Sequence, residues 1–458
     1  MRSGGLCVSL TPESVDDVFS PDVNGADYVE IRLDFLKEPQ QADHTRWDRF
    51  PVPVIATCRG VDRGGRFPGS VEEECRILET AVRNGARFVD IDYQQVRAFG
   101  SAEVIASYHN FDHTPPNLES IIEQACATGA QIAKVATHVN RWADNRRIFE
   151  ALSRSWPKPV IVSGMGDIGQ MTRIAGPSRG SFLSYASAGT ESAPGQLSLA
   201  EMLNGFKFRR IQKSTKLIGI LGMPVGHSQS HILHNRAFAA SNVDFAYMKF
   251  PANDVNDFFE NARQCGIFGF SVTIPHKLAV IPFLDRIEAE ASRIGAVNTV
   301  TETASGWVGD NTDVHGVRAA LASAGFHSSG KKVIILGRGG GAKAAAAAVG
   351  DAEEVRSLSR SEIANSNLHE CDLLINATPV GMFPRVDESP VEGPIVAGFV
   401  FDMVYNPPVT KLLTNALSQG KAIIQGTTML AAQAARQFEI WTGQPAPAEV
   451  YRADWSVS

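Results

Sequence analysis

The chain has 458 residues, of which 44% are hydrophobic and 20% charged, and its formal net charge is −6. This length exceeds one ordinary core, so we expect two or three domains. The composition is that of a soluble globular protein, and the slightly acidic balance argues against a nucleic acid or a membrane surface as partner.

Cysteine usage and the first residues bear on the compartment. The six cysteines are scattered without a CxxC pair, which indicates thiols in a reducing compartment and not disulfides or a zinc site. The opening MRSGGLCVSL lacks the apolar core of a signal peptide, and no apolar run of about 18 residues exists to span a membrane. We expect a cytoplasmic protein.

Up to about residue 205, short β-rich apolar segments alternate with amphipathic stretches. The strands are expected at 6–10, 28–33, 54–58, 88–91, 104–108, 131–136, 160–163 and 182–185, and helices at 70–84, 117–127 and 140–153. Eight β/α units in this length predict a (β/α)8 TIM barrel over residues 1–210. In such barrels the chemistry lies at the carboxyl ends of the strands.

A second α/β series follows a basic segment, FKFRRIQKSTK at 206–216, which we interpret as a surface-exposed joint between domains. A new strand is expected at 217–221. The second series is predicted to be two-lobed: a substrate lobe at 216–318, a dinucleotide-binding Rossmann lobe at 319–425, and C-terminal helices at 426–458 that return to the substrate lobe.

The run KKVIILGRGGGAKAAAAAVG at 331–350 consists of an apolar strand, a glycine-rich turn and an alanine-rich helix. The turn fits G-x-G-x-x-A, in which glycines let the backbone approach a pyrophosphate at the helix N-terminus. A purely structural glycine turn is the alternative. The residues predicted to contact the cofactor here are Gly337, Arg338, Gly339, Gly340 and Gly341.

The next strand is expected at 355–358, and its end indicates which dinucleotide binds. NAD sites place an acidic residue there, whereas this chain has Ser359, Arg360 and Ser361. An arginine between two hydroxyls suits the 2′-phosphate of NADP(H), which we therefore expect as the cofactor. The alternative is an ordinary surface arginine.

Six short motifs in the second half occur together in one order. They are GMPVGHSQSHILHN (222–235), GFSVTIPHK (269–277), GAVNT (295–299), GDNTDVHG (309–316), DMVYNP (402–407) and GTTMLAAQ (426–433). In this order they resemble the shikimate dehydrogenase family over 217–458.

That resemblance implies roles for individual residues. Ser228 and Ser230 would hold the substrate carboxylate, and Lys277 and Asp313 would be the catalytic pair beside the reacting oxygen. The rest of the substrate shell would be Thr273, Asn298, Tyr405 and Gln433, and the nicotinamide side would be lined by Met403 and Gly426.

The chemistry of the catalytic pair agrees with this assignment. Hydride transfer to a ketone leaves an alkoxide that must gain a proton, and a lysine ammonium oriented by a carboxylate can supply it. Taken alone, Lys277 could be a solvated lysine at a helix start and Asp313 a helix cap.

One position departs from the family pattern, because His231 stands where the family usually has proline. His227, His231 and His234 suggest a metal site, but no acidic or cysteine ligand lies near them in the sequence. We expect no metal.

Two motifs of the first half carry chemistry: Ser107-Tyr108-His109-Asn110-Phe111 at the end of the fifth strand, and Ala133-Lys134-Val135-Ala136-Thr137 on the sixth. Burial in an apolar strand disfavours a charged lysine, so we expect Lys134 to be a neutral amine ready to form a Schiff base. His109 is placed to move protons near neutral pH. The alternative is that the lysine extends out of the barrel end.

With the segments EIRLD (30–34), TCR (57–59), MTRIAG (171–176) and SAPGQ (192–196), these motifs resemble type I 3-dehydroquinate dehydratase over about 5–205. The resemblance implies Lys134 as the Schiff-base lysine and His109 as the general acid and base. The substrate-binding residues it implies are Ser9, Glu30, Arg32, Arg59, Arg173, Ser192 and Gln196.

A second departure lies four residues after Arg59. The family usually has glutamate there, before two glycines, and this chain has Arg63. Either Asp62 substitutes for that carboxylate, or the assistance it gives to the histidine is absent, which would slow the enzyme.

Both halves would act on one intermediate. We expect dehydration of 3-dehydroquinate to 3-dehydroshikimate by the barrel and NADPH-dependent reduction to shikimate by the second half, with only small molecules as partners. A quinate-preferring second half and a non-catalytic metabolite sensor are the alternatives; the presence of all four catalytic residues argues against the sensor.

Overall fold

The computed structural model describes residues 4–39, 45–365 and 371–452. It divides into two compact units, Met1–Leu217 with Asp244–Ile267, and Ile218–Val243 with Phe268–Ser458. Among the described residues, no helix combines the length and apolar character needed to cross a membrane.

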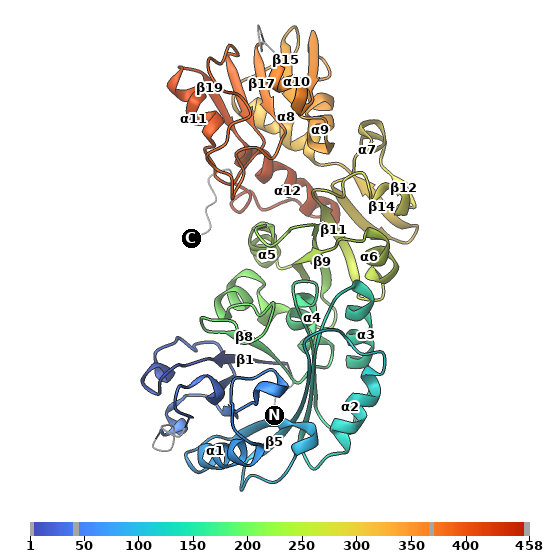
Figure 1. Cartoon of the computed structure of the whole chain (residues 1–458). Coiled ribbons are helices and arrows are strands. Elements are labelled where there is room, and N and C mark those ends of the chain that lie inside the picture. The colour runs from blue at the N-terminus through green and yellow to red at the C-terminus, as the bar shows by residue number, and fades with distance from the viewer. Residues whose placement is uncertain (1–3, 40–44, 366–370, 453–458) are drawn as a thin grey trace. The chain divides into compact units, whose positions relative to one another are not determined.

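The first unit contains eight parallel strands in the order β7-β6-β5-β4-β3-β2-β1-β8. Strands β1, β5 and β8 are labelled in Figure 1. A parallel bridge between Val160 and Ser181 joins the two edges at one end. The predicted barrel is therefore confirmed. Its strands are β1 (Gly5–Leu10), β2 (Tyr28–Arg32), β3 (Val54–Thr57), β4 (Phe88–Asp92), β5 (Glu103–Asn110), β6 (Ile132–His138), β7 (Val160–Met165) and β8 (Leu183–Ser187).

Four helices follow strands of the barrel: α1 (Val71–Arg83), α2 (Leu118–Ala127), α3 (Trp142–Leu152) and α4 (Gln170–Ala175). The start of α1 is fixed by a capping box, in which Glu73 N–H donates to Ser70 Oγ and Ser70 N–H donates to the Glu73 carboxylate. Helices α1, α2 and α3 match the amphipathic stretches predicted at 70–84, 117–127 and 140–153, and α4 is not among the predicted helices.

Side chains alternate along the strands and form layers across the barrel. One buried apolar layer takes a residue from each strand: Cys7, Tyr28, Ile55, Phe88, Ile105, Ile132, Ile161 and Leu183. Two residues further along each strand comes a polar layer of Ser9, Glu30, Thr57, Asp90, Ser107, Lys134, Ser163 and Tyr185. The barrel thus has an apolar floor beneath a polar site.

The basic 206–216 segment, predicted to be surface-exposed, also contains buried aromatic side chains. Phe206 and Phe208 are buried, while Arg209 is exposed and pairs with Asp27 at 2.6 Å. The charged groups lie on the surface as expected, and the two aromatic rings pack inward.

Part of the predicted substrate lobe belongs to the first unit. Strand β10 (Phe245–Pro251) and helix α6 (Val255–Ala262) pack there with α3. The Trp142 ring meets Phe250 and Phe258 edge-on at 5.5 and 4.7 Å, and its Nε1 donates to Pro251 O at 3.0 Å.

In the second unit, β9 (Lys216–Gly222), β11 (Ile267–Val272), β13 (Thr299–Thr303), β14 (Gly306–Asp310) and β12 (Arg286–Ile287) follow one another in one sheet. Helix α5 (Ser230–Ala240) follows β9, and α7 (Ala289–Ile294) follows β12. The turns after β9 and β11 carry the Ser228 and Lys277 motifs.

A five-stranded parallel sheet with the order β16-β15-β17-β18-β19 confirms the Rossmann prediction. Its strands are β15 (Lys332–Leu336), β16 (Glu354–Leu358), β17 (Leu373–Asn376), β18 (Phe399–Asp402) and β19 (Ala422–Gln425), accompanied by α8 (Asp313–Ser323), α9 (Gly340–Ala348), α10 (Arg360–Asn365) and α11 (Lys411–Ser418).

The C-terminal region differs from the expectation of several helices at 426–458. Within the described residues it holds one helix, α12 (Gly426–Thr442), which packs against α8 and α5. Gly443 ends it in the left-handed conformation, with φ of 69°, and Pro445 and Pro447 follow. Residues 453–458 lie outside the described part.

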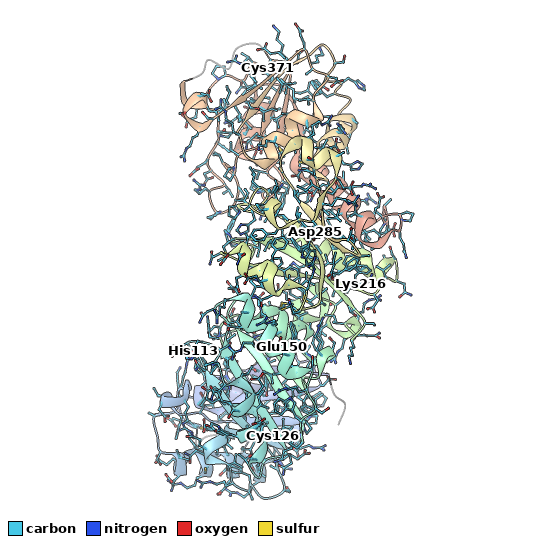
Figure 2. The ribbon with its side chains drawn as sticks, turned by 90° about the vertical axis from the view of Figure 1, so that its right-hand side faces the viewer. His113, Cys126, Glu150, Lys216, Asp285 and Cys371 are labelled. Carbon is cyan, nitrogen blue, oxygen red and sulfur yellow. The ribbon has the colours of Figure 1, made fainter. Side chains whose placement is uncertain are left out.

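All six cysteines are buried free thiols. Cys126 on α2 and Cys371 before β17 are labelled in Figure 2.

Candidate active sites

The polar layer of the barrel brings together residues from neighbouring strands. Lys134 Nζ lies 2.7 Å from Asp90 Oδ2 and 3.7 Å from Glu30 Oε1. The lysine is 5% exposed and its Nζ also lies 4.0 Å from the centre of the Tyr185 ring. Two carboxylates and an aromatic face therefore surround the amine.

This environment corrects the expectation of apolar surroundings for Lys134. The strand neighbours of Lys134 are apolar, but the barrel interior places two carboxylates beside it, so the buried nitrogen has polar partners. A Schiff base forms by attack of an amine nitrogen on a carbonyl carbon, and the Lys134 nitrogen lies within this polar layer.

Asp90 is the central group that sequence reasoning missed. It is fully buried and accepts hydrogen bonds from Arg59 at 3.0 Å, Ser107 at 2.8 Å and Lys134 at 2.7 Å. Burial raises its pKa, but the positive charges of Lys134 and Arg59 outweigh burial and hold the pKa well below its usual range. The two-residue alternation along β4, which puts Phe88 in the apolar layer, predicts this inward position.

Glu30 is held by hydroxyl donors. Ser9 Oγ donates to Glu30 Oε2 at 2.6 Å, Thr57 Oγ1 donates to Oε1 at 2.9 Å, and Gln196 Nε2 donates to Ser9 Oγ at 3.4 Å. Gln196 Oε1 in turn accepts from the backbone and hydroxyl of Ser192 at 2.8 and 2.9 Å. Four of the predicted substrate-binding residues thus form one hydrogen-bonded set.

Two predicted arginines border this set. Arg32 forks onto Asp34, with Nε and Nη2 at 2.9 and 2.7 Å from its two oxygens. Arg173 is buried and donates Nε to Gly164 O at 2.9 Å. Burial lowers the pKa of Arg173 to about 10, partly offset by Glu191, so it remains a cation at neutral pH without a bonded carboxylate.

His109 occupies the end of β5, in a ring stack with Phe111 at 6.0 Å. Burial and the positive charges of Arg59 and Lys134 lower its pKa well below the usual value, against the opposing charge of Asp90. The imidazole is therefore a neutral base at pH 7. Within the described residues, no hydrogen bond links it to a carboxylate.

Arg63 forms its own ion pairs. It lies 2.8 Å from the buried carboxylate of Glu74 and 3.2 Å from the exposed Asp62. Asp62 is thus engaged with Arg63, and no contact between described atoms joins it to His109. Burial raises the pKa of Glu74 despite the guanidinium.

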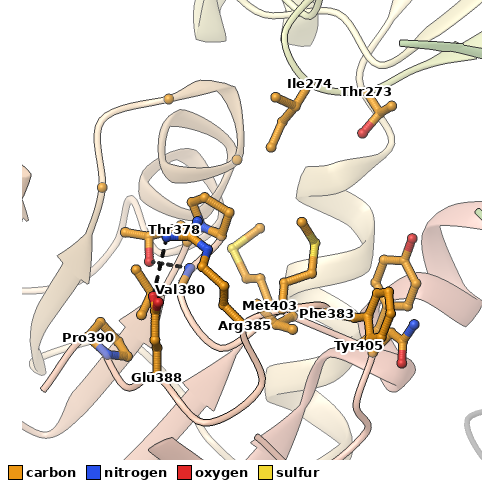
Figure 3. A pocket seen from close by; sticks show the side chains of 18 of the residues that line it. Thr273, Ile274, Thr378, Val380, Phe383, Arg385, Glu388, Pro390, Met403 and Tyr405 are labelled. Atoms are coloured by element: carbon orange, nitrogen blue, oxygen red, sulfur yellow. Dashed lines mark hydrogen bonds and ion pairs between the residues drawn. The ribbon is translucent and has the colours of Figure 1, made fainter. Parts of the chain in front are cut away.

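The second unit contains a cavity of about 1520 Å³ (Figure 3). Its lining includes the predicted residues Ser228, Thr273, Lys277, Gly337, Arg338, Gly339, Gly340, Gly341, Ser359, Arg360, Met403 and Tyr405. Of the other predicted residues, all of them described, Ser230, Asn298, Asp313, Ser361, Gly426 and Gln433 do not line it. The space is large enough for a dinucleotide and a small substrate.

Lys277 and Asp313 meet as predicted, with Lys277 Nζ donating to Asp313 Oδ2. The other carboxylate oxygen accepts from Asn298 Nδ2 at 2.8 Å. Asn298 is itself fixed, because its Oδ1 accepts from Thr312 N–H and from Thr299 Oγ1, both at 2.8 Å. The pair is therefore held from behind by buried amide and hydroxyl groups.

The predicted Gln433 and the unexpected Gln437 extend this network, and the predicted Ser228 and Ser230 form a separate pair. Gln433 Oε1 accepts from Asn298 Nδ2 at 3.2 Å, and Ser228 Oγ lies 3.2 Å from Ser230 Oγ. Gln437, one turn of α12 after Gln433, is buried, donates to Thr299 Oγ1 at 3.0 Å and accepts from Ser271 Oγ at 3.0 Å.

The glycine-rich turn fits a dinucleotide. Gly337 has φ of 115°, which favours glycine, and its N–H donates to Leu358 O at 2.8 Å, so the turn lies beside the end of β16. Helix α9 begins at Gly340 without a side-chain cap. A pyrophosphate would find free N–H donors there, and the residues present fit the cofactor.

Asp402 lies just before the loop that carries Met403 and Tyr405. It is buried, accepts from Thr410, Asn376 and Val404, and has a pKa raised to about 6 by burial. A Cβ at Gly426 would lie 2.4 Å from Val404 O, so this glycine permits close packing beneath the loop that carries Met403 and Tyr405.

Comparisons with known proteins match both halves. A family model described as type I 3-dehydroquinase matches residues 6–213, one for the shikimate dehydrogenase substrate binding domain matches 220–300, and one for the shikimate 5′-dehydrogenase C-terminal domain matches 426–453. The class of protein is therefore a dehydroquinase joined to a shikimate dehydrogenase.

The chain is 33% identical, over 97% of its length and 83% of the relative's, to the chloroplastic bifunctional 3-dehydroquinate dehydratase/shikimate dehydrogenase of Arabidopsis thaliana. It belongs to this bifunctional family. It is also 37% identical to shikimate dehydrogenase (NADP(+)) of Microcystis aeruginosa, over 53% of this chain and 96% of that one. A solved shikimate dehydrogenase in complex with NADP+ has 35% identity and a TM-score of 0.49, covering 53% of this chain and 94% of that chain.

Proposed function

We propose that the chain carries out two consecutive steps of the shikimate pathway: dehydration of 3-dehydroquinate to 3-dehydroshikimate, and NADPH-dependent reduction of 3-dehydroshikimate to shikimate. The observation that carries the proposal is a pair of lysine–carboxylate contacts, Lys134 with Asp90 in the barrel and Lys277 with Asp313 in the second unit, where Lys277 lines the cavity. A cytoplasmic location remains part of the proposal.

In the barrel, the Lys134 amine condenses with the substrate ketone and releases water. His109, neutral at pH 7, takes a proton from the carbon next to the iminium and returns a proton to the departing hydroxyl. Hydrolysis of the iminium regenerates Lys134. Asp90 lies beside Lys134 and Arg59, so it holds both in place throughout.

Substrate binding in the barrel falls to groups around this centre. Arg173, a buried cation with no bonded carboxylate among the described residues, is the partner for the substrate carboxylate. Ser9, Glu30 and Gln196 provide donors and acceptors for ring hydroxyls, with Arg32, Arg59 and Ser192 completing the shell.

In the second unit, Gly337–Gly341 and the turn at Ser359, Arg360 and Ser361 would hold NADPH, with Met403 and Gly426 on its nicotinamide side. The bound cofactor would supply the hydride. Lys277 gives a proton to the oxygen of the reduced ketone, and Asp313 orients the ammonium. Ser228 and Ser230 bind the carboxylate, and Thr273, Asn298, Tyr405 and Gln433 surround the ring.

Initial rates with a panel of substrates and cofactors test these assignments. We expect 3-dehydroshikimate with NADPH to be turned over far faster than with NADH, and shikimate oxidation to exceed quinate oxidation. Equal rates with both cofactors would overturn the NADP assignment, and faster quinate oxidation would overturn the substrate assignment.

A further inference from the structure

Arg338 is the second residue of the glycine-rich turn, and its side chain extends from this turn to Ser357 and Glu362. Its Nη2 lies 2.9 Å from the Glu362 carboxylate and its Nε donates to Ser357 O at 3.4 Å. Both partners belong to the end of β16 and the start of α10. The guanidinium therefore lies over the end of the second Rossmann strand.

An arginine in this turn could bind either the pyrophosphate or the adenosine ribose of a dinucleotide, and the location of the guanidinium distinguishes these two roles. The pyrophosphate of a dinucleotide binds at the N-terminus of the helix after the first strand, here at Gly340, whereas the adenosine ribose lies at the end of the second strand. Arg338 contacts the ribose end. An arginine there meets the ribose 2′ position.

Resting on the NADP dependence proposed above, we propose that the Arg338 side chain recognises the 2′-phosphate of the cofactor together with Arg360, and takes no part in binding the pyrophosphate. Both arginines line the cavity. Two guanidinium groups at one strand end give the phosphate the multiple charge-assisted donors that it favours.

Stabilisation of the turn between β16 and α10 is not a sufficient role for the Arg338 side chain. Glu362 already closes that turn, because its carboxylate accepts from Ser359 N–H at 2.7 Å, three residues back. Arg338 is 60% exposed, and its Nη1 has no bonded partner among the described residues. It therefore keeps donors for an anion while Glu362 and Ser357 hold the other side of its guanidinium.

The test compares two small ligands on the full chain by isothermal titration calorimetry. Adenosine 2′,5′-bisphosphate carries the 2′-phosphate, and 5′-AMP lacks it, so their ratio of affinities isolates this group without any turnover. The variants are Arg338→Ala, Arg360→Ala and the conservative Arg338→Lys. Arg356→Ala is the matched control, because Arg356 is an exposed cation on β16 that does not line the cavity.

Arg338→Ala is expected to weaken bisphosphate binding by about ten- to a hundredfold and leave 5′-AMP binding unchanged. Arg360→Ala should act likewise, Arg338→Lys should lie between, and Arg356→Ala should match the parent. Thermal melting of each variant checks that the exposed substitutions leave the fold intact.

If Arg338→Ala weakens the binding of both nucleotides equally, the side chain lies on the 5′-phosphate side and the inference is wrong. The inference is also wrong if Arg338→Ala weakens the binding of neither nucleotide. A parent chain that binds both ligands equally would instead overturn the NADP assignment on which the inference rests. If the parent prefers adenosine 2′,5′-bisphosphate and Arg338→Ala keeps the same preference, the role of Arg338 is refuted and the NADP assignment stands.

Discussion

Replacing Asp90 with asparagine removes a carboxylate that, alone among the described residues, is ion-paired with both Lys134 and Arg59. The two cations lie 2.7 and 3.0 Å from it, and all three side chains are less than a tenth exposed. Glu30, at 3.7 Å from Lys134, cannot replace it for Arg59. Breaking a buried ion pair in this way typically costs about 3–5 kcal/mol, because a charge is left buried without its partner.

We therefore expect Asp90→Asn to destabilise the barrel by about that amount and to lower the dehydratase rate by about a hundredfold through misplacement of Lys134. Dehydrogenase activity should be unchanged. Asp92→Asn is the control. Asp92 lies two residues further along β4, its one side-chain hydrogen bond within the described part of the chain is from Gln94 N–H, and the substitution should change stability by less than about 1 kcal/mol.

Hydrogen–deuterium exchange of β4 and β6 in increasing urea reports on the barrel alone, since a chain of two units need not unfold in one step. Dehydratase and dehydrogenase rates are measured on the same samples. If Asp90→Asn and Asp92→Asn have the same stability and the same dehydratase rate, Asp90 does not position Lys134 and does not stabilise the barrel as proposed.

Borohydride added with 3-dehydroquinate should trap a covalent adduct on Lys134, seen by mass spectrometry of peptides, and a Lys134→Ala protein labelled as well as the parent would exclude the Schiff base. Lys277→Ala should lower the dehydrogenase kcat by about 10²–10⁴ with cofactor affinity nearly unchanged, whereas Asp313→Asn should also weaken shikimate binding; parental kcat in Lys277→Ala would make the lysine a bystander. Because burial and nearby cations depress the pKa of His109, and it must be neutral to act as a base, the acid limb of dehydratase kcat/KM should lie well below pH 6.5, and a midpoint at or above 6.5 would contradict this. The buried His234 has its pKa lowered to about 3, so the unfolded chain binds the extra proton below pH 6.5 and the second unit should lose stability as pH falls from 6.5 toward 3; His234→Asn should flatten that dependence in urea titrations, and an unchanged slope would refute it.

Much of the fold is predictable because each strand is a short apolar run with its own turn signals. The eight barrel strands and the Rossmann unit around Gly337 are of this kind. The packing of β10 and α6 beside α3 is not, since it depends on how Trp142 meets Phe250 and Phe258, residues more than a hundred positions away.

The candidate site residues are predicted from sequence motifs, so functional residues that belong to no motif are not predicted. Asp90 belongs to no motif used here, although the alternation from Phe88 would place it inward. The sequence predicts apolar surroundings for Lys134 because its strand neighbours are apolar, whereas its partners Asp90 and Glu30 come from other strands. A barrel interior is assembled across strands, so the charge environment of one residue requires the register of all of them.

The most direct test of the bifunctional assignment starts the purified chain on 3-dehydroquinate with NADPH and follows NADPH loss and shikimate by mass spectrometry. We expect the parent to consume NADPH and form shikimate in equal amounts. Lys134→Ala and Lys277→Ala should each fail alone, and their mixture should restore the conversion, because each supplies the step that the other lacks. Failure of the parent to form shikimate from 3-dehydroquinate, with NADPH unconsumed, would contradict the assignment.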